Sequence, residues 1–171
     1  MSPPLFGVVG WKNAGKTTLM TRLIAELVGR AYAVAVIKHA HEAFDVDHQG
    51  RDSFKMREAG ACEVALSSLR RFALMRELGE APEMSLAEIL ACVGRCDLVL
   101  VEGFKREDFP KIEIRKEGAR SRTPLYEEFP RIVAIASDRP ETETEKLPVF
   151  QIDDIAGIAD FVVDHLGLKQ S

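Results

Sequence analysis

The chain has 171 residues, of which 46% are hydrophobic and 29% are charged. This length and composition suit one globular domain with a buried core and exclude a mainly disordered chain. The formal net charge of −4 at pH 7 argues against broad, non-specific binding to nucleic acid. No apolar run approaches the roughly 20 residues that span a bilayer, and the first residues lack a secretory pattern, so we expect a cytoplasmic protein that does not bind membranes.

A short buried strand and a helix are predicted at the start of the chain. The apolar residues 4–10 end in a glycine, which favours a strand followed by a turn. Leu19, Leu23 and Leu27 then recur at helical spacing within residues 16–30. The joining segment, GWKNAGKTT, therefore lies between a strand and a helix, which is the setting of a phosphate-binding loop.

This segment fits the Walker A or P-loop pattern G-x-x-x-x-G-K-[ST] through Gly10, Gly15, Lys16 and Thr17. Glycines let several backbone N–H groups point at one anion, and the following helix adds its positive N-terminal end. Lys16 can reach the outer phosphates of a nucleotide, where it also acts in catalysis, and the hydroxyl of Thr17 can ligate Mg²⁺. The predicted nucleotide-binding residues are Gly10, Lys12, Asn13, Ala14, Gly15, Lys16, Thr17 and Thr18.

A second strand is predicted over residues 32–40, and the polar residues that follow it form a loop. Histidines and aspartates gather in this region: His39, His41, Asp45, Asp47, His48 and Asp52. One interpretation is a transition-metal site, and another is a loop that brings an acid to the Mg²⁺ and phosphates of the nucleotide. A solvated loop without such a role is the third. Under the second interpretation, Asp47 is preferred to Asp45 as a magnesium ligand and catalytic acid.

Residues 53–61 predict a short helix with Asp52 or Ser53 as its cap. Residues 62–78 favour two strands with a tight turn near Ser68. A helix over the second half of that segment is the alternative.

The rest of the chain continues the alternation of helix and strand. A helix over residues 85–94 begins with Ser85 and Glu88, which form a capping box. Four strands and a last helix follow, over residues 96–104, 111–116, 131–137, 147–153 and 154–168. Asp153 or Asp154 caps the last helix. We predict an α/β protein with a three-layer P-loop NTPase fold, in which helices cover both faces of a largely parallel sheet, built as a single domain.

An acid stands at the end of the strongest predicted strand. Glu102 follows four apolar residues and precedes Gly103, which allows the chain to turn sharply. Ligands of such sheets bind at the carboxyl ends of the strands. In P-loop proteins an acid at the end of a neighbouring strand commonly helps to hold the Mg²⁺. We therefore predict that Glu102 binds Mg²⁺, through water, or orients the attacking water. An ordinary acid at a strand end is the alternative.

A second acid, Asp138, directly follows the strand of residues 131–137. A carboxylate can accept hydrogen bonds from the N1 and N2 positions of guanine, which adenine does not offer. Asp138 thus predicts GTP as the nucleotide, with a residue that merely starts a loop as the alternative. Basic residues cluster nearby, namely Lys105, Arg106, Lys111, Arg115, Lys116, Arg120 and Arg122. They can hold a phosphorylated small molecule or an acidic partner, or form a solvated face.

Three segments together resemble the molybdopterin-guanine dinucleotide biosynthesis protein B family: GWKNAGKTTL, VIKHAHEAFDVDHQGRDSFKMREAGA and DLVLVEGFKREDFPKIEI. The resemblance implies a P-loop GTP-binding protein with weak GTPase activity, which uses Mg²⁺ and forms a homodimer in the cytoplasm. It also implies molybdopterin as a ligand and, as a partner, the guanylyltransferase that attaches GMP to molybdopterin.

The resemblance also suggests roles for particular residues. Residues 10–18 would be the phosphate loop, Glu102 the acid near Mg²⁺, and Asp45, Asp47 and Asp52 members of the family's acidic loop. Basic residues around Lys105 and Lys111 would face a phosphate-bearing pterin or the partner. The predicted hairpin over residues 63–75 is a candidate dimer contact, because its apolar residues fall outside the alternation of strand and helix.

Two other functions remain open at this point. A small-molecule kinase can use the same phosphate loop, with residues 105–122 as a lid over the acceptor. A non-hydrolytic adapter can deliver molybdopterin and use the nucleotide as a structural switch. The sequence offers no obvious glutamine or arginine to assist hydrolysis, although Arg51 and Arg57 are candidates, and this suits a slow GTPase.

Overall fold

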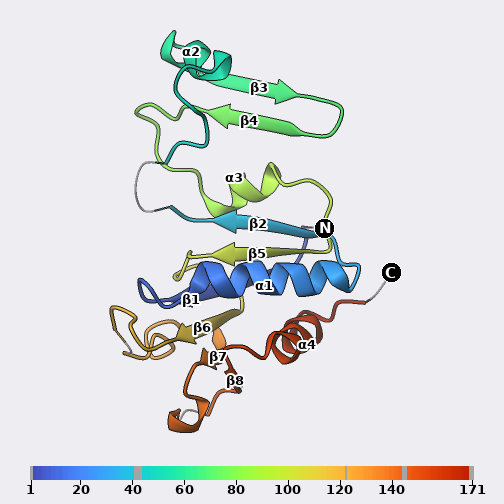
Figure 1. Ribbon diagram of the computed structural model, residues 1–171, viewed down its shortest axis with the longest axis vertical. Coiled ribbons are helices and arrows are strands. Elements are labelled where there is room, and N and C mark those ends of the chain that lie inside the picture. The colour runs from blue at the N-terminus through green and yellow to red at the C-terminus, as the bar shows by residue number, and fades with distance from the viewer. Residues whose placement is uncertain (1, 41–43, 122, 144–145, 170–171) are drawn as a thin grey trace. The chain divides into compact units, whose positions relative to one another are not determined.

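The computed structural model describes residues 2–40, 44–121, 123–143 and 146–169 (Figure 1). Contacts along the chain form two compact units, which are residues 1–39 with 92–171, and residues 40–91. Each unit contains its own sheet. Within the described ranges, none of the helices combines the length and apolar character needed to cross a lipid bilayer.

A six-stranded sheet with parallel neighbours forms the centre of the first unit (Figure 1). Its strands are β1 (Leu5–Gly10), β2 (Val34–Lys38), β5 (Leu98–Glu102), β6 (Lys111–Arg115), β7 (Ile132–Ser137) and β8 (Val149–Gln151). They lie in the order β2-β5-β1-β6-β7-β8. Because the strands run the same way, Gly10, Glu102 and Ser137 end at one edge of the sheet. The predicted α/β class with a largely parallel sheet is confirmed.

Two helices of the first unit pack together over one face of the sheet. They are α1 (Lys16–Gly29) and α4 (Ile155–Leu166), and their apolar residues join a buried cluster with Phe6 and Val8 of β1. Phe6 and Val8 share this face because alternate residues of a strand point the same way. Burial of this cluster removes a large apolar surface from water, which is the main force that holds the helices on the sheet.

The opposite face is closed near β1 and β7 by the irregular segment that joins β6 to β7. Val9 and Ile132 pack there against Leu125, and Trp11 and Tyr126 border this second cluster. Val9 faces away from α1 because it is the neighbour of Val8 in the strand, and successive side chains of a strand point to opposite faces. Both faces of β1 are therefore buried, which explains the continuous apolar run that predicted this strand.

The second unit has four elements: α2 (Asp52–Glu58), β3 (Glu63–Ser67), β4 (Phe72–Arg76) and α3 (Leu86–Ala91). β3 and β4 form an antiparallel hairpin, and the N–H of Ser68 donates to the carbonyl of Arg71 at 2.9 Å to close its turn. The predicted hairpin is confirmed, and the alternative of a helix over residues 70–78 is wrong.

Two of the predicted helix starts are confirmed. The carboxylate of Glu88 accepts hydrogen bonds from the N–H and hydroxyl of Ser85, at 2.8 and 2.6 Å, in the expected capping box. Asp154 is the N-cap of α4, and its side chain accepts the N–H of Gly157 at 3.0 Å. Of the two predicted caps of this helix, the second is therefore the one used.

The predicted cap of α2 is wrong. The N-cap position belongs to Arg51, whose side chain makes no capping hydrogen bond, and Asp52 is the first helical residue. Ser53 has the right chemistry for a cap, but its hydroxyl donates to the carboxylate of Asp47 at 3.0 Å instead. The hydroxyl of Ser53 therefore bonds to Asp47, outside the helix, and does not cap α2.

Candidate nucleotide-binding site

The predicted phosphate loop, residues 10–18, joins the end of β1 to the start of α1. Its strand and helix are the ones that the motif requires. Gly15 is the N-cap of α1 and has a φ of 90°, a left-handed conformation that residues with a side chain rarely adopt. A glycine at this position therefore allows the loop to turn into the helix.

The ammonium group of Lys16 lies within this loop. Its Nζ donates to the carbonyls of Gly10 and Trp11, at 3.1 and 3.0 Å. Burial lowers the pKa of Lys16, the negative charge of Glu102 opposes that change, and the positive charge of Lys105 reinforces it. A cation that is partly withdrawn from water interacts strongly with an anion such as a phosphate group.

The structure brings Thr17 and Glu102 together at the carboxyl edge of the sheet. The hydroxyl of Thr17 donates to Oε2 of Glu102 at 3.4 Å, although the residues are far apart in sequence. Glu102 is only 9% exposed, and the ammonium of Lys38 lies 3.9 Å from the same oxygen. A hydroxyl and a carboxylate are hard oxygen ligands, so this donor set fits Mg²⁺.

The chain turns sharply directly after Glu102. Gly103 has a φ of 94° and Phe104 a φ of 48°, both in the left-handed region. The ring of Phe104 stacks on that of His39, with 4.6 Å between ring centroids, and the N–H of His39 donates to the carbonyl of Glu102 at 3.0 Å. A left-handed phenylalanine is strained, and the stacked ring helps to hold it. These contacts fix the backbone that carries Glu102.

Lys105 lies beside the phosphate loop. Its ammonium is 5.2 Å from the centre of the Trp11 ring, a cation–π distance, and Trp11 Nε1 donates to the carbonyl of Thr123 at 2.9 Å. Trp11 thus connects the loop after β5 with the segment after β6. A role for Lys105 toward a phosphate-bearing ligand or a partner stays a prediction. Arg122 of the same predicted basic cluster lies outside the described residues.

Lys111, expected to face a ligand or partner, is fully buried. Its Nζ donates to the carbonyls of Glu107 and Phe109, at 2.5 and 2.8 Å, and lies 3.6 Å from the centre of the Phe109 ring. Burial lowers its pKa to about 8. The prediction was wrong because Lys111 is on an inner strand of the sheet, where its ammonium holds the segment after β5 in place.

Arg115 departs from the same prediction, because it is 4% exposed and belongs to a buried network. Its guanidinium lies 3.0 Å from a carboxylate oxygen of Glu113 and 2.6 Å from one of Glu143, over the ring of Tyr126. Glu143 also accepts the hydroxyl of Ser137 at 2.7 Å. The network fastens the segment after β7 to the sheet. Glu113 lies on the same strand as Arg115, but Glu143 is too far away in sequence to be found by spacing.

Asp138, the predicted guanine-reading acid, lies directly after β7 at the same edge as residues 10–18. Its N–H donates to the carbonyl of Arg115 at 3.2 Å, and its Oδ2 accepts the N–H of Glu117 at 2.7 Å. The structure therefore places this acid at the edge of the sheet that ligands use, with its carboxylate held by the segment after β6.

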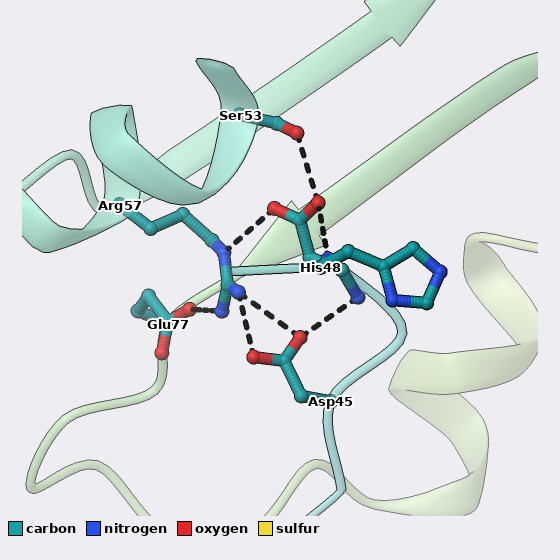
Figure 2. A network of polar contacts seen from close by, with 6 residues as sticks. Asp45, His48, Ser53, Arg57 and Glu77 are labelled. Carbon is teal, nitrogen blue, oxygen red and sulfur yellow. Dashed lines mark hydrogen bonds and ion pairs between the residues drawn. The ribbon is translucent and has the colours of Figure 1, made fainter. Parts of the chain in front are cut away.

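Figure 2 shows the acidic loop of the second unit, where Arg57 lies at the centre of a network. Its guanidinium is 2.8 Å from Asp45 and 2.7 Å from Glu77. Asp47, with an 8% exposed side chain, accepts the hydroxyl of Ser53 at 3.0 Å, and its other oxygen lies 3.5 Å from Arg57. The hydrogen bonds from Arg57 hold the pKa of the Asp45 carboxyl below its ordinary value. Asp45 and Asp47 therefore tie the acidic loop to α2 through Arg57 and Ser53.

The transition-metal interpretation of this region finds no support in the described residues, which contain no group of three or more His, Cys, Asp and Glu that could hold a metal ion. His41 lies outside the described residues. Asp52 starts α2, and its carboxylate lies 3.6 Å from Lys55. His39 instead stacks on Phe104 in the first unit.

The sequence analysis did not single out Lys38, the cation beside Glu102. It ends β2, and β2 pairs with β5 so that Lys38 stands opposite Glu102. Its place at the end of an apolar strand was a visible signal. What the sequence did not reveal is that β2 and β5 are neighbours, with β5 inserted between β2 and β1.

The chain has clear relatives among known proteins. Residues 5–138 match the family model of molybdopterin guanine dinucleotide synthesis protein B, MobB. The chain is 38% identical over 165 residues to the molybdopterin-guanine dinucleotide biosynthesis adapter protein of Escherichia coli (strain K12), which covers 95% of this chain and 93% of that protein. The adapter protein of the same name from Haemophilus influenzae (strain ATCC 51907 / DSM 11121 / KW20 / Rd) is 37% identical over 163 residues, covering 95% and 89%.

Solved structures show the same fold. Bacillus subtilis MobB superposes with a TM-score of 0.76 at 26% identity, over 98% of this chain and 99% of that one. A MobB homolog from Bacillus stearothermophilus gives a TM-score of 0.69 at 26% identity, over 95% and 97%. The family model covers most of the chain, and the relatives match it nearly end to end. This chain belongs to the molybdopterin guanine dinucleotide synthesis protein B family.

Proposed function

We propose that this protein binds GTP with Mg²⁺, hydrolyses it slowly, and acts as an adapter in forming the guanine dinucleotide form of the molybdenum cofactor. The observation that carries the proposal is the placement of Lys16 within a phosphate loop, with Thr17 and Glu102 joined at 3.4 Å beside it. The relatives described above are named adapter proteins, which favours this role over that of a small-molecule kinase.

Each of these residues has a separate task in the proposal. Lys16 binds the outer phosphates, and the oxygens of Thr17 and Glu102 hold Mg²⁺, which neutralises phosphate charge when it is bound. The ammonium of Lys38 lies 3.9 Å from Oε2 of Glu102 and competes with Mg²⁺ for that carboxylate, because the two cations repel each other. Asp138 accepts the N1 and N2 hydrogens of guanine.

Slow hydrolysis follows from the groups around the proposed magnesium site. Among the described residues, neither an arginine nor a glutamine bonds to Thr17 or Glu102, so no group there resembles the usual aid to water attack. Asp47 is our candidate for a further magnesium ligand and catalytic acid. Its bonds to Ser53 and Arg57 mean that replacing it also loosens the acidic loop, so lost hydrolysis alone would not identify its role.

We also infer that the protein works as a cytoplasmic homodimer and meets a molybdopterin guanylyltransferase. The hairpin of the second unit supports a protein contact, because its large apolar side chains are exposed: Leu66, Leu69, Phe72 and Leu74. Apolar surface of this extent is more favourable when a second copy covers it. Molybdopterin is a further ligand in this proposal, bound either by this protein or by the guanylyltransferase.

Calorimetric titration with GTP and with ATP, each with Mg²⁺, tests the binding proposal. We expect the wild type to prefer GTP, and Lys16→Ala to lose about 100-fold in GTP affinity, because charged hydrogen bonds to phosphate are removed. Lys169→Ala, an equal loss of charge on an exposed residue beyond α4, is the control and should bind normally.

Two results would contradict the proposal. Unchanged GTP affinity in a folded Lys16→Ala variant would remove residues 10–18 from the site, and preference for ATP would overturn the assignment of GTP. Glu102→Gln separates hydrolysis from the adapter role, because it weakens the hold on Mg²⁺. If that variant binds GTP without cleaving it and still supports cofactor assembly, the nucleotide acts as a switch rather than as a substrate.

A further inference from the structure

Residues 116–120, which directly follow β6 and are called the β6 strap here, contact both ends of the proposed nucleotide site. The N–H of Arg120 donates to the carbonyl of Lys12 in the phosphate loop at 2.9 Å. The N–H of Glu117 donates to the carboxylate of Asp138 at 2.7 Å. One short segment of the first unit therefore joins the phosphate end of the site to its base-reading end.

The side chain of Lys116 lies along the phosphate loop. A Cβ atom placed on Gly15 would be 3.7 Å from Cδ of Lys116, which is ordinary van der Waals contact. The methylene stem of a lysine is apolar and can cover a flat surface while its ammonium stays in water. The methylene stem of Lys116 thus provides apolar surface next to Gly15, the N-cap of α1.

Glu117 holds Asp138 through its backbone and anchors the strap through its side chain. The N–H of Glu117 donates to Oδ2 of Asp138 at 2.7 Å and so helps to fix the orientation of that carboxylate. The carboxylate of Glu117 itself pairs with the guanidinium of Arg139, which follows Asp138 in the chain. The strap is therefore fixed on the side of β7 as well as on the phosphate loop.

We propose that the β6 strap is the specificity-determining wall of the nucleoside pocket. The stem of Lys116 packs against the guanine ring, and the N–H of Glu117 is the positioning group that keeps Asp138 in the orientation that reads guanine. This inference rests on the proposed function, because it assigns the base end of the same GTP site. A pre-oriented carboxylate binds its partner more tightly, since less conformational freedom is lost on binding.

The first test compares Lys116→Ala, which removes the stem, with Lys116→Met, which keeps an unbranched apolar chain without the charge. Calorimetry with GTP, GDP and pyrophosphate should show about 10-fold weaker binding of both nucleotides to Lys116→Ala. Lys116→Met should stay within about threefold of the wild type, and pyrophosphate should bind all three proteins equally. Equal losses in both variants would mean that charge matters rather than the stem, and would overturn the proposal.

The second test isolates the hydrogen bond to Asp138 by comparing two variants that both lose the ion pair between Glu117 and Arg139. Glu117→Pro also lacks the backbone N–H, whereas Glu117→Ala keeps it. We expect Glu117→Pro to lose about 10-fold of the preference for GTP over ATP, and Glu117→Ala to retain it. Pyrophosphate affinity reports whether the phosphate loop is intact in Glu117→Pro. A preference for GTP that is unchanged in both variants would overturn the positioning role.

The two levels of the argument fail in different ways. If the wild type binds neither nucleotide, the proposed function is contradicted, and the β6 strap falls with it because there is no nucleoside pocket. If the wild type prefers GTP, and the variants at Lys116 and Glu117 bind and discriminate as it does, only the β6 strap is contradicted. If Lys116→Ala and Glu117→Pro lose guanine nucleotides but keep pyrophosphate, both are supported.

Discussion

At the scale of single residues, Asp138 should decide which base the protein accepts. Guanine presents two N–H donors to its carboxylate, whereas xanthine presents one N–H donor and one carbonyl. Asp138→Asn places an amide there, which can accept from the first group and donate to the second. We expect GTP affinity to fall by about 100-fold and xanthosine triphosphate to become the preferred ligand, as measured by competition calorimetry.

The control for this exchange is Asp160→Asn, the same chemical change on α4, where Asp160 pairs with Arg30 of α1. That variant should keep the nucleotide preference of the wild type. If Asp138→Asn still prefers GTP to xanthosine triphosphate, a residue other than Asp138 reads the base, and the β6 strap has no acid to position.

Lys111 predicts a dependence of stability on pH. Burial lowers the pKa of Lys111 to about 8 in the folded protein, whereas an exposed lysine in the unfolded chain has its ordinary pKa near 10.5. Between these two values the unfolded state binds more protons than the folded state, so the free energy of unfolding rises as the pH increases. Below pH 8 this gain is lost, because Lys111 is then charged in both states.

Urea denaturation at pH 7, 8, 9 and 10, carried out on the wild type and on Lys111→Met, isolates this effect. Subtraction of the variant cancels the contributions of all groups that the two proteins share. The difference in unfolding free energy should shift in favour of the wild type as the pH rises from 8 to 10. A difference that stays flat over that range would mean that Lys111 has an ordinary pKa despite its burial.

Lys111 and Arg115 also show what the sequence does not reveal about single residues. Both were assigned to a basic cluster facing a ligand, since charged side chains are rarely fully buried. Their partners are the carbonyls of Glu107 and Phe109 in one case and the carboxylates of Glu113 and Glu143 in the other. Glu143 comes from a segment that is distant in sequence. Only the folded structure therefore shows that Arg115 has buried carboxylate partners.

At the scale of elements, prediction succeeded where the signal was local. The strand and the helix on either side of residues 10–18, the hairpin, and the capping box of Ser85 and Glu88 each depend on residues close together in sequence. The start of α2 failed because Asp47, which lies before the helix, takes the hydroxyl of Ser53. The neighbours of each strand are set by the packing of the whole sheet, which local patterns do not encode.

The hairpin provides the prediction at this scale. Phe72 is 67% exposed on β4, and Glu in its place would put a charge into the proposed contact between two copies. We expect Phe72→Glu to remain folded and to shift the protein from dimer toward monomer, because burying an unpaired charge is costly. Light scattering after size-exclusion chromatography, over a range of concentrations, measures this shift.

Val28→Glu is the matched control, because Val28 is an exposed apolar residue on α1 and lies outside the hairpin. It should leave the mass of the protein unchanged. A wild type that is monomeric at every concentration would contradict the homodimer. A dimer that persists in Phe72→Glu but not in Val28→Glu would move the contact from the hairpin to the first unit.

At the scale of the whole molecule, the chain divides into a unit that carries the phosphate loop, Glu102 and Asp138, and a unit that carries the acidic loop. The single nucleotide-binding domain expected from the sequence remains a prediction. Asp47 is the residue that bears on it, because it is the proposed site residue that lies in the second unit. A measurement that reports on both units at once can show whether the nucleotide engages them together.

Hydrogen exchange with and without GTP and Mg²⁺ is such a measurement. A ligand at 100 times its dissociation constant stabilises the form that binds it by about 2.7 kcal/mol, so amides that exchange only when the site opens should exchange about 100-fold more slowly. We expect this protection in residues 10–18, 102–105 and 116–120 of the first unit, and none in Lys16→Ala under the same conditions. If Asp47 is a magnesium ligand, residues 44–48 become protected as well. Protection of the first unit alone would remove Asp47 from the site and leave Thr17 and Glu102 as its magnesium ligands, whereas protection of neither unit would contradict nucleotide binding.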